Sequence, residues 1–266
     1  MTMIVPLELT GLTKAFQTPS GPFVAVKNVN VRVQNSEFVC ILGHSGCGKS
    51  TVLSIIAGLQ QATEGGVAIN GRQIVTPGAD RAVVFQTPSL LPWLNARENV
   101  ALAVGRKFPA LSRAGRRAHA DAYLDLVGVA EAAGQMPAEL SLGTQQCVSL
   151  ARALAVEPEL LLLDEPFSML DSLTRFDLQD TLLRAWERDR KIVVMVTHDV
   201  DEALYLADRL VLMTDGPEAR VGDILDVPFS RPRDRHEVLG HPEYYRYRQR
   251  IIDFLENHAR QSASVQ

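Results

Sequence analysis

The chain has 266 residues, of which 46% are hydrophobic and 22% charged, and its formal net charge at pH 7 is −4. This length and apolar content suffice for a complete α/β core with an added segment. The acidic balance argues against nucleic acid as a partner, because nucleic-acid-binding surfaces are usually basic. The sequence has no stretch of about 18 uncharged apolar residues, so no membrane-spanning helix is expected. Residues 1–10 lack the features of a secretory signal and the three cysteines lack metal-ligand spacing, so we expect reduced thiols in a cytosolic protein.

Alternating apolar residues in the first part of the chain predict a small antiparallel β-portion. Leu7 to Leu12 and Val24 to Val33 both have the period of two that is typical of a strand, and a turn-rich segment, 18–22, separates them. Phe16 precedes this turn. Two roles are open for Phe16: stacking on the base of a nucleotide, or packing as a core aromatic.

A glycine-rich loop with a phosphate-binding pattern follows the first fully apolar strand, Phe38 to Leu42. The loop fits the pattern G-x-x-x-x-G-K-[ST] and consists of Gly43, His44, Ser45, Gly46, Cys47, Gly48, Lys49, Ser50 and Thr51. A helix is expected over 52–57, with Gly58 at its C-terminal stop. Glycines let the backbone approach phosphate closely, and the N–H groups of the loop and of the helix N-terminus face the anion. Lys49 would then reach the β- and γ-phosphates, and the Ser50 hydroxyl would coordinate Mg²⁺.

The middle of the chain changes from strands to helices. Ala82 to Phe85 is a short apolar strand that ends on Gln86. From Asn95 to about 154 the pattern is helical, and Asn95 and Ser112 are suitable N-caps for two of its helices. We expect this block to be a helical subdomain inserted between two core strands.

Strands alternate with helices again in the last part of the chain. Leu160 to Leu163 and Ile192 to Val196 are fully apolar strands, and they end on Asp164-Glu165 and Thr197-His198. The other expected elements are helices over 173–189 and 200–206, a strand over 210–213 and a C-terminal helix from 244. We expect only the tail, 261–266, to be disordered.

Four apolar strands therefore each end in a polar residue or loop. Apolar strands that alternate with helices predict an α/β fold with a mostly parallel sheet covered on both faces. Ligands of such sheets bind beyond the carboxyl ends of the strands. We therefore expect Gln86, Asp164, Glu165 and His198 to converge on the loop at 43–51.

These residue types suit the hydrolysis of a phosphoanhydride, which needs mainly in-line positioning and neutralisation of charge. Neighbouring residues at a strand end point in different directions, so Asp164 can face the metal while Glu165 polarises an attacking water. Gln86 and His198 can sense the γ-phosphate. The alternatives are a surface turn for 164–166, a solvated loop residue for Gln86, and a helix-capping or core residue for His198.

A further motif is the segment Leu140-Ser141-Leu142-Gly143-Thr144-Gln145-Gln146. Together with the loop at 43–51, Gln86, 160–166, 168–171 and His198, it resembles the ATP-binding subunit of ABC transporters, whose motifs occur here in the family's order up to about residue 225. The resemblance implies a P-loop NTPase fold with an N-terminal antiparallel β-portion and an inserted helical subdomain. The implied domains are an ATP-binding domain at 1–240, with its core at 1–90 and 156–240 and the helical subdomain at about 91–155, and a C-terminal helix and tail at 241–266.

The resemblance also implies a composite ATP site. Two chains would meet head to tail, so that Ser141 and Gly143 of one chain, at the start of a helix, close the ATP held by the other. Asp171 is implied to contribute to ATP binding, and Gln86 to be a further Mg²⁺ ligand. The implied cofactors are ATP and Mg²⁺. The implied partners are membrane-spanning permease subunits, a second ATP-binding subunit that is either identical or related, and indirectly a substrate-binding protein. The implied location is peripheral, on the cytoplasmic face of the cell membrane.

Leu142 departs from the family pattern, which usually has two glycines after the serine. Its side chain can crowd the approach to phosphate, which leaves the rate and geometry of the site open. The same variant is similar to the branch of the family that imports nitrate, nitrite or cyanate. Further stretches that resemble this branch are 43–48, 84–93, 169–175 and 241–245.

Several alternative functions stay open at this point. Taurine and alkanesulfonate importers form the neighbouring branch. A non-transport ABC-type ATPase is disfavoured by the single phosphate loop, the lack of a heptad arm and the acidic balance. A regulatory module without turnover is disfavoured by the intact Asp164-Glu165 and His198, although Leu142 keeps it open.

Two apolar groups have an open role. Leu90, Leu91 and Trp93 lie in a proline-flanked loop that either receives a helix of a membrane-spanning partner or forms local core. The predicted C-terminal helix has one apolar stripe, which consists of Tyr244, Tyr247, Ile251, Phe254 and Leu255. We expect this stripe to pack on its own domain, with a dimer contact as the alternative.

Overall fold

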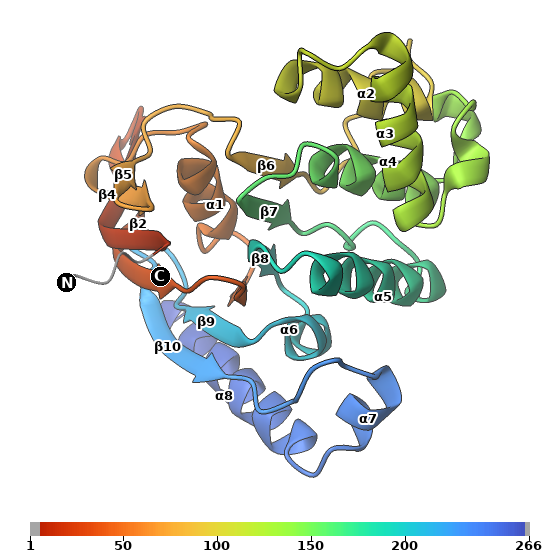
Figure 1. The fold of residues 1–266 in the computed structure, drawn as a ribbon. Helices are drawn as coiled ribbons and strands as arrows, with labels where there is room; N and C mark the ends of the chain where they lie inside the picture. The colour runs from red at the N-terminus through yellow and green to blue at the C-terminus, as the bar shows by residue number, and fades with distance from the viewer. Residues whose placement is uncertain (1–5, 264–266) are drawn as a thin grey trace, which may run out of the picture. The chain divides into compact units, whose positions relative to one another are not determined.

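The computed structural model describes residues 6–263 and divides into two compact units, whose elements are labelled in Figure 1. The first unit contains the described residues up to Gly78 and from Ile192 onward, and the second contains Ala79–Lys191. The predicted α/β class is confirmed, with mostly parallel core strands and an antiparallel portion. None of the described helices is both long enough and apolar enough to cross a membrane.

The predicted antiparallel β-portion is present in the first unit. Its strands are β1 (Leu7–Thr18), β2 (Gly21–Val33), β4 (Glu64–Ile69) and β5 (Arg72–Gln73), in the order β2-β1-β4-β5. β1 and β2 extend further toward their turn than predicted. The pairing of β1 with β2 shifts register three times between Leu9 and Ala15, and such bulges interrupt the alternation by which a strand is recognised in a sequence.

The parallel strands of the first unit carry the phosphate loop. They are β3 (Phe38–Leu42), β8 (Ile192–Thr197) and β9 (Arg209–Met213), and β10 (Val221–Asp226) adds an antiparallel edge in the order β10-β9-β3-β8. Every residue of β3 and β8 is buried, which explains their continuous apolar sequences. Helix α1 (Lys49–Ala57) packs beside β8, and α6 (Val200–Leu206) packs against β3.

The C-terminal part of the first unit contains two further helices, α7 (Arg235–Gly240) and α8 (Tyr244–Ala263). The apolar stripe of α8 packs on its own unit, as predicted, because Tyr244 and Ile251 are buried and the ring of Phe254 lies against Gly222 of β10. The expectation of a disordered tail from residue 261 is wrong for 261–263, because the helical hydrogen-bond ladder continues to Ala263, and residues 264–266 lie outside the described residues.

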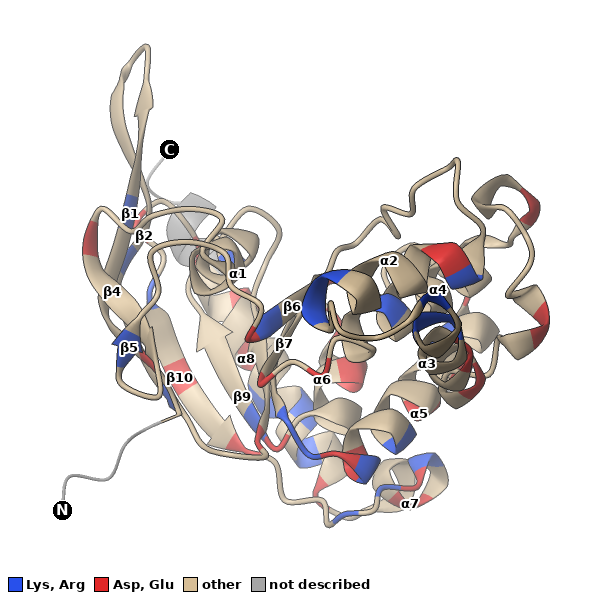
Figure 2. Ribbon diagram, turned by 45° about the horizontal axis from the view of Figure 1, so that its top comes forward, with Lys and Arg blue, Asp and Glu red and all other residues tan. Residues whose placement is uncertain are grey.

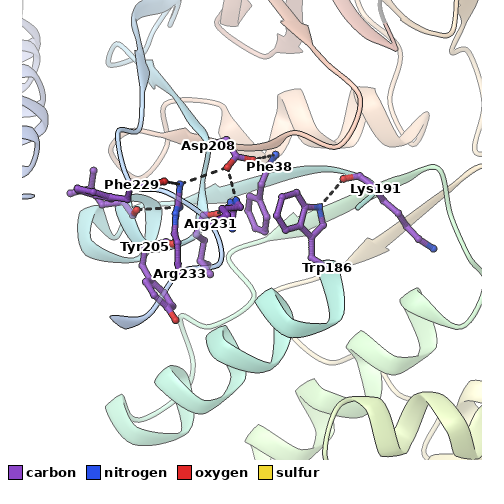
Figure 3. Close-up of polar contacts among 10 residues, drawn as sticks. Phe38, Trp186, Lys191, Tyr205, Asp208, Phe229, Arg231 and Arg233 are labelled. Atoms are coloured by element: carbon purple, nitrogen blue, oxygen red, sulfur yellow. Dashed lines mark hydrogen bonds and ion pairs between the residues drawn. The ribbon is translucent and has the colours of Figure 1, made fainter. Parts of the chain in front are cut away.

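A largely buried cluster of charged residues holds the segment before α7, which contains both basic and acidic residues (Figure 2). Asp208 accepts the backbone N–H of Phe38 at 2.9 Å and the Nε–H of Arg231 at 2.6 Å, as Figure 3 shows. Arg233 also faces Asp208, with only 1% of its side chain exposed. Burial, helped by the nearby charge of Arg231, lowers the pKa of Arg233 to about 10. These contacts fix the segment to the start of β3.

The second unit combines one parallel strand pair with most of the helices. The pair is β6 (Arg81–Val84) and β7 (Leu160–Asp164), and the helices are α2 (Ala96–Lys107), α3 (Arg113–Leu126), α4 (Leu142–Leu154) and α5 (Ser172–Arg188), with short 3₁₀ turns at Ala130–Ala132 and Pro137–Glu139. Asn95 and Ser112 cap α2 and α3, as predicted. β6 ends one residue before its predicted end, since Phe85 is no longer paired. This unit, Ala79–Lys191, includes more of the chain than the predicted helical subdomain at about 91–155. The predicted domain division stays a prediction.

Candidate nucleotide-binding site

The phosphate-binding pattern forms the turn between β3 and α1 in the first unit. Gly46 and Gly48 have φ angles of +83° and +89°, in the left-handed region that favours glycine. A Cβ atom added to Gly48 would lie 2.4 Å from Cγ1 of Val26, and one added to Gly43 would lie 2.8 Å from Sγ of Cys47. The chain therefore requires glycine at 43 for packing, and at 48 for packing as well as for backbone conformation.

Lys49 is the first residue of α1 and is only 4% exposed. Its ammonium group donates to the carbonyl oxygens of Gly43 at 2.8 Å and His44 at 2.9 Å. The N-cap residue of α1 is Gly48, which has no side chain to accept the first N–H groups of the helix. Ser45, Gly46 and Ser50 are exposed. The loop thus combines a cation, backbone donors and an accessible hydroxyl, which are the groups that bind a polyphosphate.

Two side chains of the phosphate loop, those of His44 and Cys47, contact other parts of the first unit or are buried in it. His44 Nδ1 lies 2.8 Å from Oδ1 of Asp215, a residue of the loop between β9 and β10 that no sequence motif indicates. Cys47 is 1% exposed, and burial raises the pKa of its thiol against the opposing effect of the Lys49 charge. Cys40, Cys47 and Cys147 are all free thiols, as expected.

His198 follows the strand next to the one that carries the loop. β3 and β8 are parallel, and Leu42 pairs with Thr197, so Gly43 and His198 leave adjacent strands at the same edge. The two alternative roles for His198 are both wrong: its side chain is exposed, and the residue that caps α6 is Asp199, which accepts the N–H of Glu202 at 3.0 Å. The structure therefore brings His198 and the start of the phosphate loop together, as predicted.

In the second unit, Gln86 and the Asp164-Glu165 pair also follow adjacent parallel strands, since Val84 of β6 pairs with Leu163 of β7. Gln86 Nε2 donates to Ser168 Oγ at 3.1 Å, and Ser168 Oγ donates to the carbonyl oxygen of Glu165 at 3.0 Å. Gln86 is thus attached to the turn that presents Glu165, although it is exposed.

Asp164 and Glu165 are separated by a turn of the backbone rather than by the pleat of a strand. Asp164 is the last residue of β7, and Glu165 has a φ of +45°, which is uncommon for a residue with a side chain. Backbone strain of this kind is concentrated at functional sites. The predicted convergence of all four strand ends is confirmed within each parallel pair and otherwise stays a prediction.

Two helix N-termini of the second unit carry the remaining predicted residues. Ser141 is exposed and caps α4, and its Oγ accepts the N–H of Thr144 at 3.1 Å. Asp171 caps α5 by accepting the N–H groups of Leu173 and Thr174, both at 3.1 Å. A Cβ atom at Gly143 would lie 2.4 Å from Cγ2 of Thr174, so this glycine lets α4 and α5 approach each other.

Three side chains with open roles are at least partly exposed. Phe16 is half-buried on the β1–β2 hairpin, opposite Phe23, with the Lys14 ammonium 5.1 Å from its ring centroid, so it is not a core aromatic. Trp93 is 69% exposed, which contradicts the local-core interpretation for this residue. Leu142 is half-buried as the first residue of α4.

Comparison with known proteins places this geometry in a family. The family model described as ABC transporter matches residues 26–168. The chain belongs to the ABC transporter family. As an ABC-type ATPase it binds ATP and hydrolyses it.

Two curated relatives and one solved structure illustrate the similarity of this ABC ATPase. The nitrate import ATP-binding protein NrtD of Synechococcus elongatus is 52% identical over 91% of this chain and 88% of its own length. The bicarbonate transport ATP-binding protein CmpD of Synechocystis sp. is 48% identical over 94% of this chain and 89% of its own length. The dimeric, post-hydrolysis structure of the ATP-binding cassette MJ0796 bound to ADP and Pi is similar with a TM-score of 0.76 and 35% identity, covering 84% of this chain and all of that one.

The residues of this ABC ATPase fit the groups that the family implies. A Cβ atom at either end of the turn, at Gly43 or at Gly48, would strike a neighbouring side chain, and the exposed backbone N–H groups of such a glycine turn suit a phosphate. The exposed Ser50 hydroxyl and the half-buried Asp164 carboxylate are oxygen donors of the kind that Mg²⁺ prefers. Asp215 lies outside every motif in the sequence. Ser168 and Thr174 lie within motifs, but those motifs do not indicate the positions of these two residues beside Gln86 and Gly143.

Proposed function

We propose that this chain is the ATP-hydrolysing subunit of an importer for a small oxyanion, either nitrate (with nitrite or cyanate as related substrates) or bicarbonate. The observation that carries the proposal is the complete, ordered set of ATPase motifs in a chain that is similar along most of its length to a nitrate and a bicarbonate import subunit. Nitrate and bicarbonate are both planar, singly charged oxyanions. Bicarbonate did not follow from the sequence motifs alone, because an ATP-binding subunit need not contact the anion.

The proposed partners are the membrane-spanning permease subunits, a substrate-binding protein that acts through them, and a second ATP-binding subunit. The dimeric state of a similar cassette supports the last of these. The exposed Trp93 is proposed to take part in the contact with the permease, with Leu90 and Leu91 beside it in the loop. The chain would then lie on the cytoplasmic face of the membrane as a peripheral subunit.

Each site residue has a proposed role in the reaction. The loop at 43–51 holds the phosphates through its backbone N–H groups and Lys49, and Phe16 stacks on the base. Ser50, Asp164 and Gln86 would hold Mg²⁺, which when bound neutralises charge on the β- and γ-phosphates. Glu165 orients the attacking water and accepts its proton, while His198 and Gln86 contact the γ-phosphate. Ser141, Gly143 and Asp171 contribute to binding the ATP held by the partner subunit.

The test is phosphate release by the transporter purified with its co-expressed membrane and binding subunits and reconstituted in liposomes. Nitrate, nitrite, cyanate, bicarbonate and taurine are added in turn. We expect stimulation by nitrate or by bicarbonate, and the stronger of the two identifies the substrate. Stimulation by taurine alone would keep the ATPase and refute the proposed substrate class. Stimulation by none of the anions would refute the importer function.

A Glu165→Gln variant in the same assay tests the role of the carboxylate. It should keep ATP binding and lose about 100-fold or more in phosphate release, because the neutral amide cannot accept the proton. Turnover near the wild-type rate would show that Glu165 is not the base.

A further inference from the structure

We propose that Asp215 is a positioning residue for ATP binding, which acts through His44 to hold the phosphate loop in its binding conformation. Asp215 lies in the loop between β9 and β10, outside every motif of the family that the sequence contains. The inference rests on the proposed role of the loop at 43–51 in holding the phosphates of ATP.

His44 links Asp215 to the lysine of the loop. The His44 ring contacts Asp215 at 2.8 Å, and because a carboxylate can only accept, His44 Nδ1 is the donor. The carbonyl oxygen of the same residue accepts the Lys49 ammonium at 2.9 Å and the N–H of Cys47 at 3.3 Å. Asp215 therefore fixes the side chain of a residue whose backbone fixes Lys49.

The hydrogen bond between His44 and Asp215 is shielded from water on the Asp215 side. The Asp215 side chain is 14% exposed, whereas that of His44 is 41% exposed. A hydrogen bond to a charged group is stronger when it is partly removed from water. Asp215 is therefore suited to restrict the orientation of His44 while the loop surface stays open to a ligand.

The loop that carries Asp215 is itself held to the strand beneath the phosphate loop. Backbone N–H groups of Glu218 and Ala219 donate to the carbonyl oxygens of Val24 and Ala25 at 2.8 and 3.1 Å. The next residue of that strand, Val26, is the one that a Cβ atom at Gly48 would strike. The loop that carries Asp215 is therefore hydrogen-bonded to the strand that packs against the end of the phosphate loop.

A carboxylate at this place cannot itself bind phosphate, because two negative charges repel each other. Its contribution must therefore pass through His44. Asp215→Asn keeps an acceptor oxygen but removes the charge that strengthens the hydrogen bond from His44, so the ring is held less firmly and the carbonyl group of His44 can turn away from Lys49. We expect weaker ATP binding with a nearly unchanged rate at saturating ATP, since the groups that act on the γ-phosphate are not altered.

The experiment measures ATP affinity of the purified full-length chain by displacement of a fluorescent ATP analogue in the presence of Mg²⁺. Asp215→Asn should raise the Kd for ATP about tenfold, which is the lower end of the effect of removing an outer-shell partner of a binding site. In the reconstituted transporter the KM for ATP should rise by a similar factor, with kcat within about twofold of the wild type. Asp215→Glu, which keeps the carboxylate, should recover part of the affinity.

The matched control is Asp223→Asn. Asp223 is in the same unit and makes a similar ion pair, with Arg250 at 2.8 Å, but on the side of β10 that meets α8. It should change the Kd for ATP by less than about twofold. Thermal unfolding of each variant checks that the chain remains folded.

A double-mutant cycle decides whether the effect passes through His44. In a His44→Ala background, Asp215→Asn should have no further effect on ATP affinity. The inference is wrong if Asp215→Asn has the same effect in both backgrounds, or if its effect equals that of Asp223→Asn. If the wild-type chain binds no ATP, the proposed role of the phosphate loop fails as well, and the two failures are therefore distinguishable.

Discussion

The N-termini of α1 and α4 differ in whether a side chain accepts hydrogen bonds from their first backbone N–H groups. Each helix begins with N–H groups that have no acceptor within the helix. At α4 the Ser141 side chain accepts one of them, from Thr144. At α1 the cap residue is Gly48, in a left-handed conformation with no side-chain acceptor. Among the described α-helices with an assigned N-cap, the others, α2, α3, α5, α6 and α7, resemble α4 in having a side-chain cap.

The N-terminus of α1 has no side-chain acceptor for its first N–H groups and gains one when an anion binds, whereas the N-terminus of α4 already has an acceptor in Ser141. The first turn of α1 carries partial positive charge that no side-chain cap offsets, and Lys49 adds a full charge to it, so an anion gains from both. The first turn of α4 is already capped, and Ser141 presents a hydroxyl in a fixed orientation. We therefore expect substitutions at α1 to affect ATP binding most, and substitutions at α4 to affect helix stability and turnover.

The largest effect should come from Lys49→Ala. It removes the only lysine or arginine within the phosphate-binding pattern at 43–51, so ATP affinity and phosphate release should fall together by about 100-fold or more. Displacement of a fluorescent ATP analogue and phosphate release measure the two quantities. The control is Lys107→Ala, which removes a half-buried lysine that donates to the carbonyl oxygen of Ala79 in the second unit. Equal losses in both variants would show that the effect is not specific to the uncapped terminus.

The next effect concerns the two left-handed glycines of the loop. Gly48→Ala places a Cβ atom 2.4 Å from Val26 Cγ1, whereas no atom lies within 4 Å of a Cβ at Gly46. In both variants an alanine in the left-handed conformation costs about 1 kcal/mol of stability. In Gly48→Ala the clash with Val26 costs about 2 kcal/mol more. The free energy of unfolding in urea should therefore fall by about 3 kcal/mol for Gly48→Ala and about 1 kcal/mol for Gly46→Ala. Similar values for the two variants would mean that Val26 moves away and that packing does not require Gly48.

The features that the sequence predicted correctly are those set by neighbours in the chain. The phosphate loop, the polar ends of the apolar strands and the caps Asn95 and Ser112 all follow from short patterns whose physical basis is local. The role of Gly143 was predicted only from the family, and the structure adds a second reason for it, the approach of Thr174.

The features that the sequence did not predict depend on contacts between distant segments. β10 is an edge strand of mixed exposure, so it has no continuous apolar sequence, and α7 has only 6 residues. Asp208 and Arg231 form a partly buried ion pair between distant segments of the chain, which no local pattern indicates. Asp215 is a common residue type in a loop, and only the folded structure shows its contact with His44.

A smaller effect is expected at the capped terminus. Ser141 and Ser112 are N-caps in the same unit, and each accepts one backbone N–H at 3.1 Å. Ser141→Ala and Ser112→Ala should therefore cost about the same free energy of unfolding, about 1 kcal/mol. Only Ser141→Ala should also lower phosphate release by the assembled transporter, by about tenfold, because only Ser141 is proposed to contact ATP. Equal activity in the two variants would show that Ser141 serves as a helix cap alone.

The smallest expected effect is the contribution of the negative charge of Asp171, the N-cap of α5, to the free energy of unfolding. Hydrogen bonds from the Thr174 side chain and backbone N–H hold the pKa of Asp171 below its ordinary value. A carboxylate with a lowered pKa stabilises the folded state above its unfolded-state pKa, and this contribution is lost as the pH falls toward the folded-state pKa. Asp171→Asn keeps an acceptor oxygen but not the charge, so wild type should be slightly more stable at pH 7. Urea unfolding should show that the difference in free energy of unfolding between wild type and Asp171→Asn narrows as the pH falls from about 5 to about 3.

The control is Ser141→Ala. Its difference in free energy of unfolding from wild type should stay constant over the same pH range, because a hydroxyl cap does not titrate. A gap for Asp171→Asn that is independent of pH would mean that the charge of this cap does not stabilise α5.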